Sequence, residues 1–216
     1  TMFALNQGEV CTCPPRALLA TRNHPDMALE FEGKERLIAR IGAAVTGDCP
    51  FEITTCLRKA LVECIADPGI VLPDSVYQAL PGHYARREVF TCPDRGFSMI
   101  AMTWAPGQGT LIHDHAGMWC VEGVWAGDIE VVSYRLLEQS GDRYRFQEMG
   151  TVIAGSGSAG SLIPPHEYHT IGNPNRDRVA VSVHIYRQAM ESCNEFHDLG
   201  DGWHRRRAKV LELDAA

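Results

Sequence analysis

The chain has 216 residues, 45% of them hydrophobic, and this length and composition predict one domain of ordinary size with a full core. A formal net charge of -7 disfavours nucleic acid or an anionic membrane surface as a partner, and no apolar run approaches the roughly 20 residues that span a bilayer. We therefore expect a cytoplasmic monomer or weak homo-oligomer that binds neither nucleic acid nor membrane.

The first third of the chain is predicted to be helical after an unpatterned start. Residues 1–32 show little hydrophobic periodicity, so we expect a flexible extension there. Residues 33–80 then form the helical part, whose first helix carries apolar residues at helical spacing, namely Leu37, Ile38, Ile41 and Val45. A second helix is expected over 51–66, directly after Pro50, and a short third helix after 73–75.

From residue 81 onward, short β-rich runs alternate with glycine and proline turns. The predicted strands are 86–91, 97–104, 118–125, 129–136, 145–152, 160–164, 168–172 and 178–186. Such spacing is typical of an all-β sandwich or barrel. We therefore predict a mainly β protein with a barrel over 81–190 and the helical part packed against it. Residues 191–216 are expected to be a charged C-terminal tail that forms a surface strand or helix, and 33–216 a single domain.

Two histidines, His113 and His115, lie two residues apart in a segment that is expected to be extended. Side chains at positions i and i+2 of a strand point to the same side, so two imidazoles can bind one ion together. A third histidine from a distant strand, either His166 or His169, would fill a third corner of an octahedron. The open corners favour chemistry over a structural metal. Alternatively, the pair is simply exposed on a strand.

The spacing around these histidines resembles the two sequence motifs of the cupin family. The first motif reads Gly107-x5-His113-x-His115-x4-Cys120-x6-Gly127, and the second reads Pro164-x-His166-x2-His169-x3-Asn173. The resemblance implies a small jelly-roll barrel, and it favours His169 over His166 as the third metal ligand. Most cupins carry a glutamate at the position of Cys120.

A cysteine at that position resembles the thiol dioxygenases of the cupin superfamily, specifically the cysteine dioxygenase type I family. Ser182-x-His184-x-Tyr186 matches that family's Ser-x-His-x-Tyr motif. The resemblance covers about 33–190 and implies one Fe(II) per chain, with catalytic roles for Ser182, His184, Tyr186 and Cys120. It also permits a thioether bond between Cys120 and Tyr186, which lies 17 residues after His169.

A substrate site is implied by Tyr84-Ala-Arg86, which resembles the family's Tyr-x-Arg. In the family this motif binds the substrate carboxylate, and a guanidinium is suited to that task because it offers a planar two-point clamp. The neighbouring Arg87 points the opposite way on a strand, so we expect one of the two arginines to face solvent.

Three neutral imidazoles leave a divalent ion with its full charge. We expect no acidic side chain beside them, because a carboxylate would lower that charge and disfavour an incoming thiolate. Along the predicted last strand, Ser182, His184 and Tyr186 share one face and would form a hydrogen-bonded relay, while Val181, Val183 and Ile185 share the core face.

The expected function is therefore Fe(II)-dependent addition of O2 to the sulfur of a small thiol carboxylate, with L-cysteine as the first choice. Alternatives are 3-mercaptopropionate, and mercaptosuccinate if the second arginine meets a second carboxylate. Two rival functions remain. One is another cupin chemistry, such as sugar-phosphate isomerisation or carbon–carbon dioxygenation, which usually keeps the glutamate. The other is a non-catalytic cupin that binds a metal or another ligand.

Overall fold

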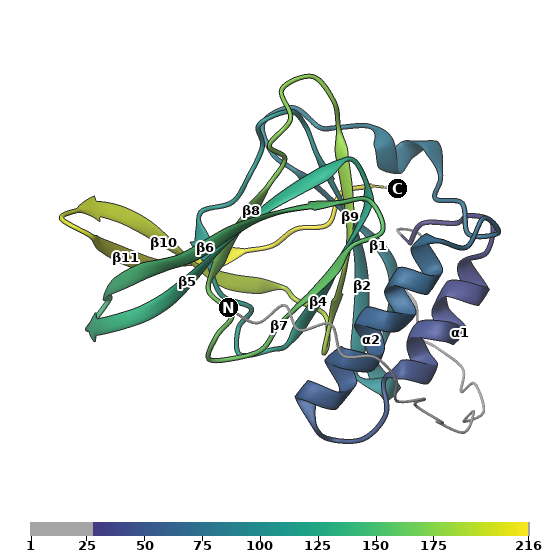
Figure 1. Ribbon diagram of the computed structural model, residues 1–216, viewed down its shortest axis with the longest axis horizontal. Coiled ribbons are helices and arrows are strands. Elements are labelled where there is room, and N and C mark those ends of the chain that lie inside the picture. The colour runs from purple at the N-terminus through teal and green to yellow at the C-terminus, as the bar shows by residue number, and fades with distance from the viewer. Residues whose placement is uncertain (1–27, 216) are drawn as a thin grey trace.

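The protein is described here by a computed structural model that places residues 28–215, so most of the predicted extension lies outside the described residues. Two antiparallel sheets form the body of the molecule (Figure 1). The first sheet has five strands, in the order β1 (Ala85–Cys92), β2 (Phe97–Trp104), β9 (Ala180–Tyr186), β4 (Cys120–Ala126) and β7 (Ala159–Leu162).

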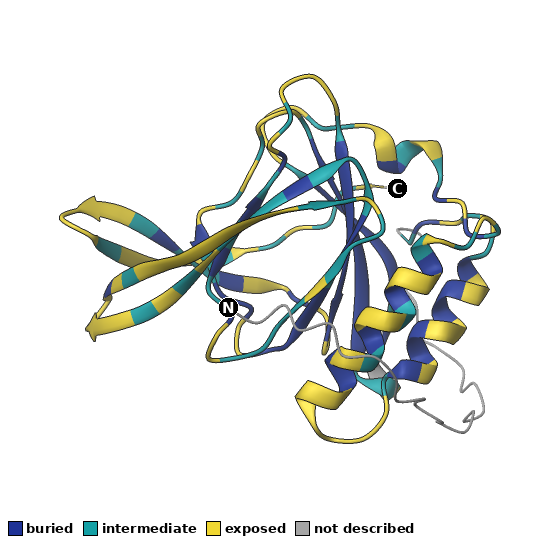
Figure 2. Cartoon of the chain, viewed as in Figure 1, coloured by how far each residue is buried: buried dark blue, intermediate teal, exposed yellow. Residues whose placement is uncertain are grey.

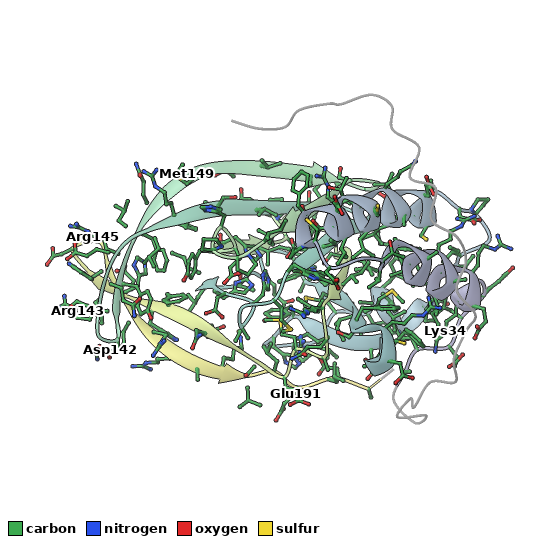
Figure 3. The ribbon with its side chains drawn as sticks, turned by 90° about the horizontal axis from the view of Figure 1, so that it is seen from below. Lys34, Asp142, Arg143, Arg145, Met149 and Glu191 are labelled. Atoms are coloured by element: carbon green, nitrogen blue, oxygen red, sulfur yellow. The ribbon has the colours of Figure 1, made fainter. Side chains whose placement is uncertain are left out.

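The second sheet closes on itself as a barrel of six strands. Its order is β10 (Ser192–Gly200), β11 (Trp203–Val210), β6 (Arg143–Gly155), β5 (Asp128–Ser140), β8 (His169–Gly172) and β3 (Ile112–His113). The β5–β6 and β10–β11 hairpins extend away from the helices (Figure 1). Figure 3 shows Asp142 and Arg143 at a hairpin tip, at the opposite end of the molecule from Lys34.

The helical part forms α1 (Lys34–Ala44), α2 (Pro50–Ile65) and a short 3-10 helix, η1 (Asp74–Tyr77). The proline at the start of α2 suits a first helical turn, where no backbone N–H is needed. Helix α2 contacts β4 and β7 on the outer face of the five-stranded sheet (Figure 1). This contact needs Gly123, because a Cβ there would lie 2.6 Å from Leu61 Cδ2. The predicted mainly β fold with N-terminal helices is confirmed.

Strand β9 separates the helix-side core from the barrel interior. Val181, Val183 and Ile185 belong to the core cluster that includes α1 and α2, while Tyr186 belongs to a second cluster on the other face. The whole strand is buried (Figure 2). Ser182, His184 and Tyr186 therefore face the space between the two sheets, as the alternation predicts.

The charged tail expected as a surface strand or helix forms the strands β10 and β11, and these strands complete the barrel. Phe196 is 2% exposed because its ring packs on Tyr144, at 4.9 Å between centroids. The expected extension is wrong at its end: Leu29 is buried, and its N–H bonds to the carbonyl of Glu88. Among the described residues, no helix has the length and apolarity to cross a membrane.

Candidate metal site

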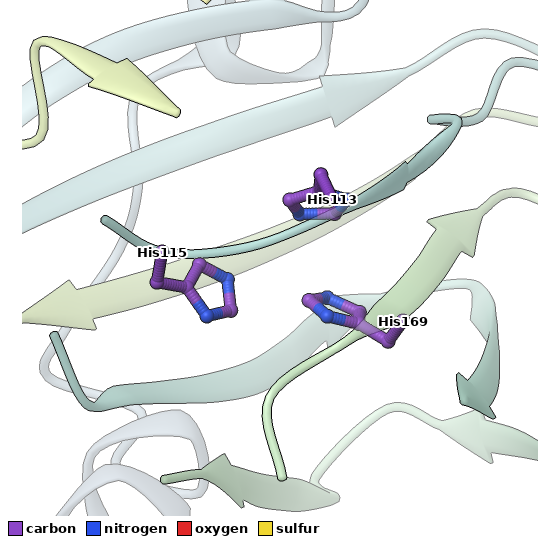
Figure 4. A group of neighbouring side chains, drawn as sticks. All are labelled: His113, His115 and His169. Carbon is purple, nitrogen blue, oxygen red and sulfur yellow. The ribbon is translucent and has the colours of Figure 1, made fainter. Parts of the chain in front are cut away.

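Three histidines from different parts of the barrel meet between the sheets. His113 ends β3 and is the register partner of His169 at the start of β8, while His115 lies just beyond the end of β3. One ligand atom from each lies within 4.8 Å of the others. Figure 4 shows the rings around a common space, with His113 and His169 centroids 4.4 Å apart. The exposed His166 is outside this group.

The expectation of a single strand carrying both His113 and His115 is wrong, because β3 ends at His113. The structure turns directly after this strand, with Ala116 at a φ of 52°. The two rings still approach to 5.4 Å between centroids, almost perpendicular to each other. The turn therefore brings the side chains of His113 and His115 together, as a regular strand would also have done.

The orientations of two rings are set by backbone carbonyls. His169 Nδ1 lies 2.8 Å from the carbonyl of Glu167, and His113 Nδ1 lies 3.1 Å from the carbonyl of Leu111. A ring nitrogen must donate to a carbonyl oxygen, so each Nε2 keeps its lone pair for another partner. This arrangement is common among histidines that bind metals.

Burial favours the uncharged form of the His113 and His115 imidazoles. Burial, together with the neighbouring His169, lowers the pKa of His113 to about 3. The same causes, with His113 added, hold the pKa of His115 well below its usual value. The buried atoms His115 Nδ1 and His169 Nε2 have no hydrogen-bond partner among the described residues. Converging ring nitrogens without hydrogen-bond partners fit a bound divalent metal ion.

A carboxylate also reaches this site, so the expectation that no acidic side chain accompanies the histidines is wrong. Glu122 Oε1 lies 3.3 Å from His169 Nε2 and 3.4 Å from His184 Nδ1. Burial raises the pKa of Glu122, but the His169 and His184 imidazoles outweigh burial and hold this pKa well below its usual range. Glu122 follows Cys120 by two residues on β4, and this alternation is the signal that could have identified it.

The polar face of β9 is joined to this carboxylate. Trp104 Nε1 donates to Ser182 Oγ at 2.9 Å, and Ser182 Oγ lies 2.8 Å from His184 Nε2. The indole nitrogen of Trp104 can only donate a hydrogen bond. The proton of a neutral His184 lies on Nδ1, because this nitrogen faces the carboxylate of Glu122. The Ser182 hydroxyl therefore donates to His184 Nε2. The expected relay is thus present between Ser182 and His184, but it begins at Trp104, and beyond it His184 Nδ1 faces Glu122 Oε1 at 3.4 Å rather than Tyr186.

Tyr186 instead faces Cys120, its register partner on β4. The two side chains share a hydrogen bond. Cys120 is 0% exposed and Tyr186 2% exposed. Burial is the main cause that raises the pKa of both groups well above their usual values. The positions suit a thioether bond between the two side chains, which stays a prediction.

A cavity opens beside the histidines and reaches the predicted substrate-binding residues. Its lining includes Tyr84, Arg86, Trp104, His113, Glu122, His184, Tyr186 and Leu211. Tyr84 stacks on Trp104 with 4.6 Å between ring centroids. The structure therefore brings the Tyr-x-Arg pair, one of the histidines and the polar face of β9 to one pocket.

Arg86 is buried and held by the carboxyl-terminal residues. Nη1 donates to the carbonyl of Glu212 at 3.0 Å, and Nη2 donates to the carbonyl of Met190 at 3.3 Å. The Asp214 carboxylate accepts a hydrogen bond from the backbone N–H of Arg86, and the backbone N–H of Asp214 donates to the carbonyl of Arg86. Arg86 Nε is buried with no hydrogen-bond partner among the described residues.

The expectation that one of the two arginines faces solvent is wrong, because Arg86 and Arg87 are each 4% exposed. Arg87 donates to Thr103 Oγ1 and to the backbone carbonyls of Gln78 and Ala215. These three acceptors lie away from the cavity, which is why Arg87 does not line it. Among the cavity residues that the structure describes, Arg86 is the only cation.

Solved structures similar to this chain include barrel proteins at low sequence identity. A double-stranded β-helix protein from Klebsiella pneumoniae has a TM-score of 0.40 and 16% identity, over 56% of this chain and 85% of that one. A cupin 2 conserved barrel domain protein from Salinispora arenicola has a TM-score of 0.38 and 19% identity, over 54% and 86%. Similarity at this level carries no functional argument.

The comparison that identifies the chain is made at the level of sequence. The family model described as cysteine dioxygenase type I matches residues 80–199, more than half of the chain. The matched part contains the three histidines, Arg86 and the Ser-x-His-x-Tyr strand. This protein belongs to the cysteine dioxygenase type I family.

Proposed function

We propose that this protein is an Fe(II)-dependent thiol dioxygenase that adds both atoms of O2 to the sulfur of a small thiol carboxylate, giving a sulfinate. Membership of the family supports a thiol dioxygenase type of cupin. The observation that carries the proposal is the group of three imidazoles, His113, His115 and His169, whose ligand atoms converge. Iron bound there would supply the redox chemistry with O2 and a soft partner for the thiolate.

Arg86 is proposed to bind the substrate carboxylate. Arg86 lines the cavity, its Nε–H is buried without a hydrogen-bond partner among the described residues, and an unsatisfied buried donor of this kind is costly unless a ligand pairs with it. A charge-assisted bond from the guanidinium would hold the far end of the substrate and so orient its sulfur. Tyr84 forms the adjacent wall, fixed by its stacking on Trp104.

Tyr186 is proposed to donate a hydrogen bond to the reacting groups. Its raised pKa keeps the phenol protonated at neutral pH, and its side chain lines the same cavity as Arg86. Cys120 restrains the ring from the neighbouring strand. Ser182 and His184 act differently, as positioning residues that orient Glu122.

The candidate thiols share one carboxylate and one sulfur. L-cysteine is favoured by the family resemblance, and 3-mercaptopropionate is the same molecule without the amine. Mercaptosuccinate carries a second carboxylate and was an alternative if a second arginine met it, but Arg87 has its three nitrogens bonded elsewhere. The geometry therefore supports a monocarboxylate better than a dicarboxylate.

Glu122 also favours a second candidate function. Cupins that isomerise sugar phosphates or cleave carbon–carbon bonds with O2 usually keep a glutamate beside the histidines, and here a carboxylate lies 3.3 Å from His169. A protein of this kind would consume no thiol. The family match favours sulfur oxidation over this alternative.

A thiol panel tests the proposal. The iron-loaded protein is supplied with L-cysteine, 3-mercaptopropionate, mercaptosuccinate and cysteamine, with O2 uptake and sulfinate mass as readouts. Sulfinate from at least one thiol carboxylate is expected. Thiol binding without O2 uptake would instead identify a non-catalytic cupin, and inertness toward every thiol would favour the second candidate.

The carboxylate clamp is tested in the same panel with Arg86→Met and Arg86→Lys, and with Arg145→Met as an exposed control. Loss of a charged hydrogen bond of about 1.5–3 kcal/mol should lower kcat/KM for thiol carboxylates by about 10- to 150-fold. Cysteamine, which lacks the carboxylate, should be affected far less. An equal loss for both kinds of thiol would remove the clamp.

A further inference from the structure

After β11 the chain returns to the edge of the five-stranded sheet. Strand β1 is an outer strand of this sheet, so its outward backbone groups need partners from elsewhere. The C-terminal segment, residues 211–215, supplies them (Figure 1). The backbone N–H of Asp214 donates to the carbonyl of Arg86 at 2.8 Å, and the Asp214 carboxylate accepts from the backbone N–H of Arg86 at 2.8 Å. The segment therefore covers the edge of β1 at Arg86.

Asp214 anchors the C-terminal segment with its side chain as well as its backbone. Besides its bond to Arg86, the carboxylate lies 2.9 Å from Nε2 of His83. Burial raises the pKa of Asp214, but hydrogen bonds from the Arg86 N–H and from His83 outweigh burial and lower this pKa below its usual value. The carbonyl of the next residue, Ala215, accepts a hydrogen bond from Nε of Arg87 at 3.2 Å. Two neighbouring residues thus fix the segment to β1.

The guanidinium of Arg86 is also held from this segment. Nη1 donates to the carbonyl of Glu212 at 3.0 Å, and Nη2 donates to the carbonyl of Met190 at 3.3 Å. Because a guanidinium is planar, bonds at both outer nitrogens fix its position and its plane. The Nε–H has no hydrogen-bond partner among the described residues, so it stays available to a ligand.

The two groups that hold this guanidinium are backbone carbonyls, which accept a hydrogen bond but carry no net charge. The Asp214 carboxylate bonds to the backbone N–H of Arg86 rather than to the guanidinium. Arg86 is therefore held in place without losing its positive charge to a neighbouring anion, and a charge-assisted bond to a ligand carboxylate remains open to it. Leu211 of the same segment lines the cavity together with Arg86.

We propose that the C-terminal segment is a positioning element of the substrate site, anchored by Asp214, which orients the Arg86 guanidinium toward the substrate carboxylate. This inference rests on the proposed function, because it needs Arg86 to be the carboxylate clamp. Asp214 acts through Arg86 and does not touch the substrate. Release of the anchor lets the guanidinium adopt other positions, so a carboxylate is bound less tightly, while a thiol without a carboxylate is unaffected.

Thiol binding to the iron-loaded full-length protein, measured by calorimetry without oxygen, tests this role. The two ligands are 3-mercaptopropionate and cysteamine, which lacks the carboxylate. Asp214→Ala should raise the dissociation constant of 3-mercaptopropionate by about 10-fold or more, and that of cysteamine by less than about 3-fold. Asp214→Asn keeps an oxygen that accepts from the Arg86 N–H, so it should restore binding to within about 3-fold of wild type. Equal shifts for the two thiols in Asp214→Ala, or no shift, would overturn the proposal.

Asp142→Ala is the matched control. Asp142 is also a carboxylate paired with a basic side chain, at 3.2 Å from Nε of Arg205, but it lies at a hairpin tip outside the cavity lining (Figure 3). Both dissociation constants should therefore stay within about 3-fold of wild type. A loss of 3-mercaptopropionate binding equal to that in Asp214→Ala would show a general effect of charge and would overturn positioning.

Hydrogen exchange on the wild-type protein gives a second test that does not depend on a variant. Coupling between two sites is reciprocal, so bound 3-mercaptopropionate should slow amide exchange in the C-terminal peptide by about 3-fold or more, and bound cysteamine should not. Unchanged exchange with bound 3-mercaptopropionate would overturn the proposal.

Failure of the proposed function has a different signature. Binding as expected without O2 uptake would refute thiol oxidation and leave the positioning role of the C-terminal segment standing. If 3-mercaptopropionate does not bind to the wild-type protein, the Arg86 clamp is refuted, and the positioning role is refuted with it.

Discussion

The hydroxyl of Ser182 links the side chains of Trp104 and His184 through hydrogen bonds. Replacing this serine breaks the link with the smallest change in side-chain volume. The hydroxyl joins Trp104 Nε1 at 2.9 Å and His184 Nε2 at 2.8 Å, and all three residues are at most 2% exposed. Ser182→Ala leaves a buried donor and a buried acceptor without partners. At about 1–3 kcal/mol for each unsatisfied group, the free energy of unfolding should fall by about 2–6 kcal/mol.

Urea unfolding of the metal-free protein, followed by far-ultraviolet circular dichroism, measures this loss. Ser98→Ala is the matched control, since Ser98 is equally buried on the neighbouring strand β2 and its hydroxyl serves one carbonyl, that of Gln188, at 2.9 Å. The control should lose only about 1 kcal/mol. Equal losses in the two variants would show that Ser182 does not link two buried groups.

A double-mutant cycle with Trp104→Phe isolates the indole contact. Phenylalanine removes the N–H donor, so Ser182→Ala should cost about 1–2 kcal/mol less in that background than in the wild type. The cavity left by the smaller ring appears in both Trp104→Phe proteins and cancels from the comparison. If the losses of the two single variants add up to within about 0.5 kcal/mol of the loss in the double variant, the hydrogen bond from Trp104 to Ser182 is refuted.

Three further changes test the packing, the crosslink and the metal ligands. Gly123→Ala inserts a methyl group against α2 and should lower the free energy of unfolding by about 1–3 kcal/mol, read from urea midpoints; an unchanged midpoint would contradict the close approach. Cys120→Ser should abolish any mobility-shifted species that a thioether with Tyr186 produces on a denaturing gel, and a persisting doublet would place the crosslink elsewhere. His169→Ala should lose bound iron, measured by metal analysis after gel filtration, whereas the exposed His166→Ala should retain it; the reverse result would exchange their roles.

The sequence determines those features of this protein that depend on residues close together in the chain. Apolar residues at helical spacing predict α1, and the flanking prolines help to predict α2 within one residue of each of its ends. Period-2 alternation predicts the two faces of β9, with Ser182 and His184 on the polar one. Motif spacing selects the family, which the family model confirms. Each inference needs only local geometry, because a helix or strand fixes which of its own side chains share a face.

What lies opposite each face is decided by strand pairing, which no local pattern specifies. Glu122 reaches the histidines because β4 pairs with β9 in the register that sets Glu122 beside His184. The sequence led us to expect one of the two arginines in solvent, yet Arg87 is buried as well as Arg86, because residues far from it in the chain, at 78 and 215, supply carbonyl acceptors for its charge. Burial of a polar group depends on its partners, and only the tertiary structure brings those partners within reach.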